Sequence, residues 1–281
     1  MKSYIIALMV AVAAVVCSSG EAEAAPKRLK GSGNIITKEL PAPKHYRSVH
    51  ASRSVKVNLI ANEGQPVKIK ADDNVMEHVV VAVNGGVLSV TISDKVRTIA
   101  SVNVTVTVPC DGKLSSLKAA SAGQIHSEVQ IKGEEVELQA SSAGEIKGSI
   151  LATECDIDLS SAAKIYCKVG GSSCSIEASS AAICTATLAV QECEVDASSA
   201  AEVNLKGATL RCDADLSSAA ELNAKNFAVE NYDIDVSSAA DATIFCTKRL
   251  DAEASSGGYI RYSGNCQVSS KRSSGGTIKS Y

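Results

Sequence analysis

The sequence predicts an all-β protein, a single-stranded parallel β-helix with coils of about 19 residues. Two observations predict this fold: a motif of small residues that recurs at a nearly constant spacing, and a strict alternation of apolar and acidic residues before each copy. Both are typical of a solenoid, in which a repeat buries its apolar face only by stacking on its neighbours.

The recurring motif is Ala or Ser, then Ser, then two residues that are each Ala or Gly. Its copies are separated by 18 to 21 residues and begin at Ala120, Ser141, Ser160, Ser179, Ser198, Ser217, Ser237, Ser255 and Ser273. Helical solenoids need longer repeats, so coils built of short strands are expected. The motif supplies small residues where the chain turns between strands. A nucleophilic serine is the alternative, but no His or Lys recurs beside these serines to activate one.

The residues before each motif alternate with the period of a half-buried strand. In the seven copies from Ser141 to Ser255, the positions one, three and five residues upstream are all apolar. The positions two and four residues upstream hold 12 acidic residues among 14. Apolar side chains are therefore expected to point inward and carboxylates outward, on parallel strands stacked about 4.8 Å apart.

Cysteine takes one of the inward columns. Cys155, Cys174, Cys193 and Cys212 lie five residues before four successive motifs, where other copies have Val, Tyr or Leu. A column that accepts these residues is expected to be core, with cysteine acting as a small hydrophobe. Disulfides between adjacent coils are the alternative, because the coil spacing falls within the Cα range of a disulfide. The four histidines lie outside this cysteine-rich stretch, which argues against a zinc site.

The N-terminus has the pattern of an export signal. Residues 1–24 are expected to be a cleaved signal peptide, because Lys2 precedes an apolar run from Ile5 to Val16 and a small-residue cleavage pattern ends at Ala24. The run is too short to span a bilayer, and no later stretch is long enough. The mature chain is therefore expected in the periplasm, on the outer-membrane surface or outside the cell. Lipidation at Cys17 is the alternative.

The remaining chain divides at about residue 110. Residues 25–110 contain β-rich runs and the hairpin signal Asn84-Gly85-Gly86, and are expected to continue or cap the solenoid. Residues 111–281 form the repeats with the small-residue motifs. With a formal charge of −3 and few aromatic residues, the chain lacks the basic patches and stacking platforms of a nucleic-acid binder.

The outward carboxylates leave three interpretations open. They form a solvated face that keeps the stack soluble, or a calcium site, since calcium prefers oxygen ligands. The calcium candidates are Asp156, Asp158, Glu194, Asp196, Asp213, Asp215, Asp233 and Asp235. The third interpretation is a carbohydrate-active enzyme that uses one carboxylate pair, such as Asp156 with Asp158. No pair is singled out and sugar-stacking aromatics are scarce, so no catalytic residue, and no cofactor other than calcium, is expected.

A family resemblance rests on residues before and within the repeats. The run GSGNI at Gly31–Ile35, the run from Ser48 to Ile92 and the iterated serine motifs resemble the DUF2807 family of auto-transporter adhesin head GIN domains, over residues 31–281. The resemblance implies a right-handed β-helix exported by a Gram-negative bacterium, with no catalytic residues to carry over. We therefore expect a non-catalytic surface protein, an adhesin or structural module, whose partner is a cell-surface, matrix or glycan component. Self-association is a further expectation.

Overall fold

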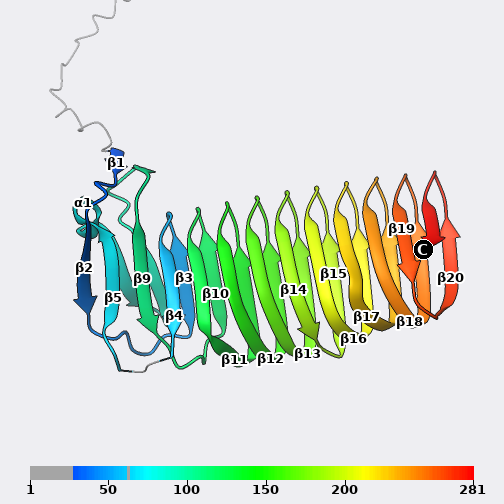
Figure 1. The fold of residues 1–281 in the computed structure, drawn as a ribbon, viewed down its shortest axis with the longest axis horizontal. Helices are drawn as coiled ribbons and strands as arrows, with labels where there is room; N and C mark the ends of the chain where they lie inside the picture. The colour runs from blue at the N-terminus through cyan, green and yellow to red at the C-terminus, as the bar shows by residue number, and fades with distance from the viewer. Residues whose placement is uncertain (1–27, 62–63) are drawn as a thin grey trace, which may run out of the picture.

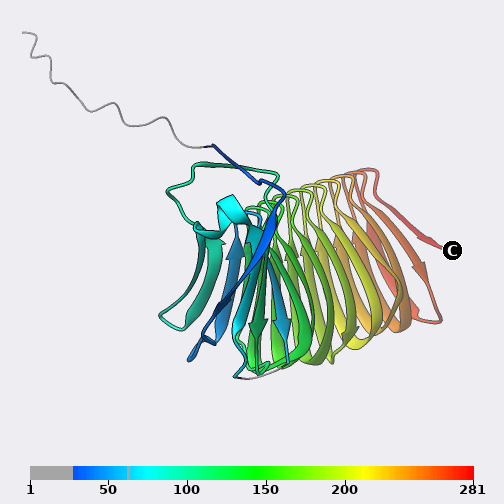
Figure 2. The ribbon, with the colours of Figure 1, turned by 60° about the vertical axis from the view of Figure 1, so that its left-hand side comes forward.

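The computed structural model describes residues 28–61 and 64–281 and shows a solenoid of about nine turns (Figure 1). The expected signal peptide and Cys17 lie outside the described residues. Each coil turns sharply at one edge of the solenoid, follows one side, bends at the opposite edge and returns along the other side (Figures 1 and 2). The prediction of stacked parallel coils is confirmed.

The regular stack consists of parallel strands. Its elements are β10 (Ser116–Ala120), β11 (Gln124–Ala140), β12 (Glu145–Leu159), β13 (Lys164–Ala178), β14 (Ile183–Ala189), β15 (Glu192–Ala197), β16 (Glu202–Leu216), β17 (Glu221–Val236), β18 (Asp241–Ala254), β19 (Tyr259–Ser263), β20 (Gln267–Arg272) and β21 (Thr277–Ser280). Several coils form one strand of 14 to 17 residues rather than the short strands expected from the sequence. The strands are long because the hydrogen-bond ladder to the next coil continues around the bend, as it does between β12 and β13.

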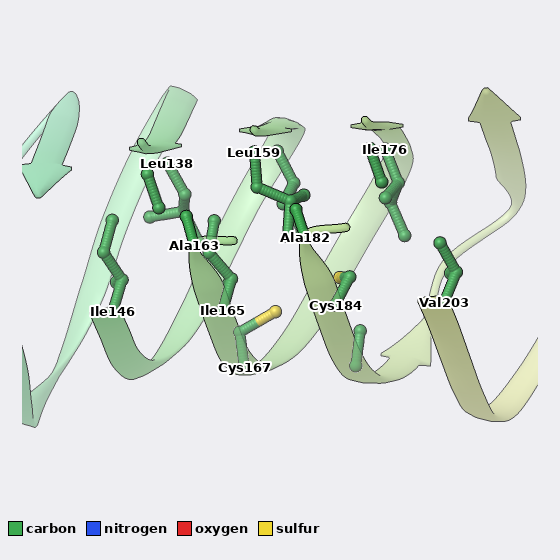
Figure 3. Packing of buried hydrophobic residues seen from close by; sticks show 14 of the residues in the cluster. Leu138, Ile146, Leu159, Ala163, Ile165, Cys167, Ile176, Ala182, Cys184 and Val203 are labelled. Carbon is green, nitrogen blue, oxygen red and sulfur yellow. The ribbon is translucent and has the colours of Figure 1, made fainter. Parts of the chain in front are cut away.

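The inward apolar columns form the core. Leu138, Ile157, Ile176 and Val195 occupy the same register position on successive coils and are at most 2% exposed. Figure 3 shows Leu138 and Ile176 packed between the two sides of the solenoid. Burying each such side chain stabilises the stack by about 1.5–3 kcal/mol. The predicted alternation of inward apolar and outward polar residues is therefore present coil after coil.

The small-residue motifs form type I′ turns. In the turn that starts at Ser160, both Ser161 and Ala162 have a positive φ, and the Ala163 N–H donates to the Ser160 carbonyl. A left-handed conformation costs a non-glycine residue about 1–2 kcal/mol. The stacking of turns offsets this cost, because the Ala162 N–H donates to the carbonyl of Ser180 in the next coil at 3.0 Å.

The same ladder of turns begins earlier than the sequence motif does. Arg53 and Ser54 also have positive φ, and the Ser54 N–H donates to the Ser121 carbonyl at 3.0 Å. The four-residue motif does not mark this turn, because Arg53 and Val55 replace its usual small residues. Val55 is fully buried beneath the turn, so this coil keeps the turn geometry with a larger core side chain.

The N-terminal segment joins the stack. Its elements are β1 (Arg28–Lys30), β2 (Ile35–Leu40), β3 (Ser48–Ser52), β4 (Lys56–Ile60), β5 (Val67–Asp72), α1 (Asp73–Met76), β6 (Val79–Asn84), β7 (Val87–Ile92), β8 (Thr98–Ala100) and β9 (Val104–Pro109). β3 pairs with β10 and β4 with β11, both in parallel, while β6 and β7 form an antiparallel hairpin whose turn residues Gly85 and Gly86 have positive φ. One core cluster runs from Leu29 to Ile278, so the segment and the repeats share a core.

Candidate functional site

Two columns of carboxylates run along the strands that precede the turns. Register pairing aligns the first column through Glu194, Asp213 and Asp233 and the second through Asp196, Asp215 and Asp235. All eight calcium candidates are exposed on these columns: Asp156, Asp158, Glu194, Asp196, Asp213, Asp215, Asp233 and Asp235. The outward direction predicted for these side chains is confirmed. Ser175 interrupts the first column between Asp156 and Glu194.

A groove with a volume of about 640 Å³ follows the first column across the coils. We name it the acidic groove. One wall is the first column, and the other consists of the outward residues two positions earlier on the same strands. Its lining comprises Asp156, Ser175, Glu194, Asp213, Asp233 and Asp251 on one side, Glu154, Ser173, Glu192, Arg211, Asn231 and Arg249 on the other, and Cys174, Cys193, Cys212 and Tyr232 between them.

A second groove, of about 490 Å³, lies between the second column and the first serines of the turns. Its polar lining is Asp158, Glu177, Asp196, Asp215 and Asp235 with Ser179, Ser198, Ser217 and Ser237. The turns therefore do more than reverse the chain, because their serines form one wall of a groove whose opposite wall is acidic. The sequence did not predict either groove. Its alternation places the carboxylates on one face but does not show where that face is hollowed.

Positive charge is distributed unevenly along the acidic groove. Arg211 makes an ion pair with Glu192, and Arg249 makes one with Asp251 at 3.3 Å. Both arginines belong to the coils nearer the C-terminus. The part of the lining that comes from Glu154 and the strands up to Glu194 contains no Lys or Arg.

Partial burial and the repulsion between neighbouring carboxylates raise the pKa of three of these side chains. The pKa of Asp215, Asp233 and Asp235 is raised, first by their partial burial and then by neighbouring carboxylates. For Asp215 these neighbours are Asp196 and Asp233. A raised carboxyl pKa means that the charged form is disfavoured here, so this surface would be stabilised by a cationic ligand.

The structure does not gather the carboxylates around one point. Within residues 28–61 and 64–281, no three His, Cys, Asp or Glu side chains are grouped closely enough to hold a metal ion. The columns run parallel along the solenoid instead. Calcium binding at the eight candidate residues stays a prediction, which thermal unfolding in chelator and in millimolar calcium would test.

The cysteine column lies in the core, as the sequence suggested. Cys155, Cys174, Cys193 and Cys212 are at most 4% exposed, and no disulfide joins them. Burial also raises the pKa of Cys184, in a neighbouring column, to about 12. These thiols pack as small apolar groups.

The Gly31–Asn34 run, on which part of the family resemblance rests, has a structural role that the sequence did not show. The buried carboxylate of Asp72 accepts hydrogen bonds from the N–H of Gly33 at 2.8 Å and of Asn103 at 2.7 Å. Asp73 accepts from the Ser32 hydroxyl at 2.6 Å and from the Asn34 side chain at 2.9 Å. These contacts fasten the first strands to the end of the solenoid.

The fold and the grooves define this protein as a parallel β-solenoid with a hollowed acidic face. The chain belongs to the DUF2807 family, described as "Putative auto-transporter adhesin, head GIN domain", whose model matches residues 45–173 and 157–266. This match confirms the resemblance seen in the sequence. No curated protein matches the chain.

Solved structures share the fold. A putative adhesin from Parabacteroides distasonis is 17% identical, with a TM-score of 0.67 over 91% of this chain and 100% of that one. A putative adhesin from Parabacteroides merdae is 20% identical, with a TM-score of 0.65 over 90% and 99% of the two chains. A putative lipid binding protein from Parabacteroides distasonis is 16% identical, with a TM-score of 0.66 over 91% and 100%. At these identities the similarity shows the fold alone.

Proposed function

We propose that this protein is an exported, non-catalytic adhesin that holds a partner against its acidic face. Membership of an adhesin family supports a binding role at the cell surface. None of the helices in the described residues is long and apolar enough to cross a membrane. The observation that carries the proposal is the acidic groove, a hollow of about 640 Å³ that spans several coils and has seven carboxylates and two arginines among its 16 lining residues.

The chemistry of the groove favours a cationic partner. The pKa of Asp233 is raised first by partial burial and then by neighbouring carboxylates, and a bound Lys or Arg side chain would relieve that repulsion. A groove that continues from coil to coil fits an extended segment better than a compact ligand. Tyr232 is the only aromatic residue in the lining and is 2% exposed, so the groove offers no platform for stacking a sugar ring.

A matched pair of variants tests this proposal. Asp213→Asn with Asp233→Asn removes two neighbouring charges from the groove. Glu202→Gln with Glu221→Gln removes two neighbouring charges from the same coils, on the strands after the turns. Binding of a fluorescent oligo-lysine peptide to purified residues 28–281 is then measured by anisotropy at low and at physiological salt.

We expect the groove variant to weaken oligo-lysine binding by about tenfold and the control variant by less than about twofold, since surface charge effects decay within a Debye length. Binding by the unchanged chain should also weaken as salt is added. The proposal fails if the chain does not bind oligo-lysine, or if the two variants lose the same affinity.

A further inference from the structure

Four cysteines form a continuous ladder inside the solenoid. Cys155 lies opposite Cys174, Cys174 opposite Cys193, and Cys193 opposite Cys212 in the parallel register. In-register residues on neighbouring parallel strands are about 4.8 Å apart, which falls within the Cα separation that a disulfide accepts. All four side chains are buried on the core side of the strands.

The register allows two bonds at once in one pairing of the ladder, because a bond between Cys174 and Cys193 would leave Cys155 and Cys212 without a neighbour. A hydrogen bond with Cys155 is the main cause of the raised pKa of Cys174, followed by burial. A hydrogen bond with Cys212 is the main cause of the raised pKa of Cys193, again followed by burial. The pairing that uses all four thiols is therefore 155 with 174 and 193 with 212, and the causes of both pKa shifts agree with it.

We propose that Cys155–Cys174 and Cys193–Cys212 are oxidation sites, at which a disulfide oxidant links adjacent coils covalently. In each pair one thiolate attacks a sulfur of the oxidant and releases half of it as a thiol. The second thiolate then displaces the other half. Two protein S–H bonds are replaced by one S–S bond, and the oxidant leaves as two thiols that carry the two electrons and the two protons.

The folded environment determines when this chemistry occurs. Burial and the hydrogen bonds between thiols disfavour the thiolate, which is the reactive form. Oxidation of the closed stack is therefore slow, and the bonds form while the coils assemble in a compartment that supplies disulfide oxidants. Each bond closes a loop of 19 residues, from 155 to 174 and from 193 to 212, and links one coil to the next.

Two other buried cysteines serve as an internal control. Cys167 lies opposite Ala186, and Cys184 lies opposite Ile165, so these two cysteines are offset by two residues along the strands. Figure 3 shows both side chains in the packed interior. Diagonal neighbours on adjacent strands are about 7–8 Å apart, beyond the reach of a disulfide. Cys167 and Cys184 therefore remain thiols when the ladder is oxidised.

The test is to refold reduced, unfolded residues 28–281 with oxidised and reduced glutathione, and in parallel with reductant alone. Remaining thiols are alkylated after acid quenching and unfolding, and peptides are mapped by mass spectrometry without reduction. We expect cross-linked peptides joining Cys155 to Cys174 and Cys193 to Cys212, with the mass lowered by two hydrogen atoms per bond. Cys167 and Cys184 should be alkylated. The oxidised protein should melt at least about 5 °C above the reduced one.

A variant assigns the pairs independently. In Cys155→Ala, Cys174 should be alkylated while the bond between Cys193 and Cys212 still forms. A bond between Cys174 and Cys193 in this variant or in the unchanged chain, or any bond that includes Cys167 or Cys184, would overturn the pairing. Alkylation of all four ladder thiols after refolding with glutathione would overturn the proposal as a whole.

Discussion

Removing one charge from the acidic face should stabilise the fold at neutral pH. Asp215 lies between Asp196 and Asp235 in the second column. Two unit charges about 5 Å apart in water repel by about 0.8 kcal/mol, and physiological salt reduces this by about half. Two such neighbours, discounted for exposure to solvent, give a net repulsion of about 0.5–1 kcal/mol. We therefore expect Asp215→Asn to raise the free energy of unfolding by about that amount.

The pH dependence of this effect follows from the raised pKa of Asp215. The folded state binds the proton of Asp215 more tightly than the unfolded chain does, so unfolding releases it. Stability therefore increases as the pH falls from neutral through the raised folded pKa, towards the ordinary value of 3.8. Below that value the aspartate is neutral in both states, and the advantage of Asn over Asp disappears.

Urea unfolding followed by circular dichroism measures this prediction at pH 7 and at about pH 3, each at low and high salt. Asp158→Asn is the matched control, because Asp158 has Gln139 on one side and Glu177 on the other. With one acidic neighbour it should give about half the stabilisation. If Asp215→Asn is no more stable than the unchanged chain at neutral pH and low salt, repulsion along the column is not the dominant effect.

Three further substitutions test other parts of the structure by the same assay. Phe227 is fully buried, so Phe227→Ala should lower the free energy of unfolding by about 3–5 kcal/mol, and a loss under about 1 kcal/mol would contradict the core packing. The buried hydroxyl of Tyr232 has no oxygen or nitrogen partner and faces only the Cys212 thiol, a weak hydrogen-bond partner. Tyr232→Phe should therefore be neutral or stabilise by about 1 kcal/mol, whereas a clear loss would show that the hydroxyl is bonded. Asp72→Asn weakens the charge-assisted bonds from the N–H groups of Gly33 and Asn103, so it should lower the free energy of unfolding by about 2 kcal/mol. It should also expose the segment before residue 35 to proteases. Unchanged protection of that segment would refute this role of Asp72.

The repeated part of the fold was predictable because its signals are local. The alternation that puts Ile157 inside and Asp158 outside spans adjacent residues, and the period of the motif sets the coil length. The register follows from both, since a shift by one residue would expose every apolar side chain. The motif also gave the position of the turns from Ser121 onward, although not the left-handed conformation of Ser161 and Ala162.

Other features were not predictable because they depend on contacts between distant residues. The hydrogen bonds that Asp72 accepts from the N–H groups of Gly33 and Asn103 join segments separated by 39 and 31 positions. The turn at Arg53 lacks the small residues that mark the others, and only its stacking on Ser121 reveals it. The carboxylates were assigned to one face correctly, but the sequence does not show where the folded strands leave a hollow in that face.

We propose that the acidic groove is the contact surface of an exported adhesin, and this proposal can be tested on cells. The most direct test expresses the full chain in bacterial cells and measures two quantities: its digestion by protease added to intact cells, and cell attachment to a surface coated with oligo-lysine. We predict that the chain is digested from outside, and that attachment falls with Asp213→Asn plus Asp233→Asn but not with Glu202→Gln plus Glu221→Gln. Protection from the external protease would contradict exposure of the chain on the cell surface. Equal attachment by the two variants would contradict binding at the acidic groove.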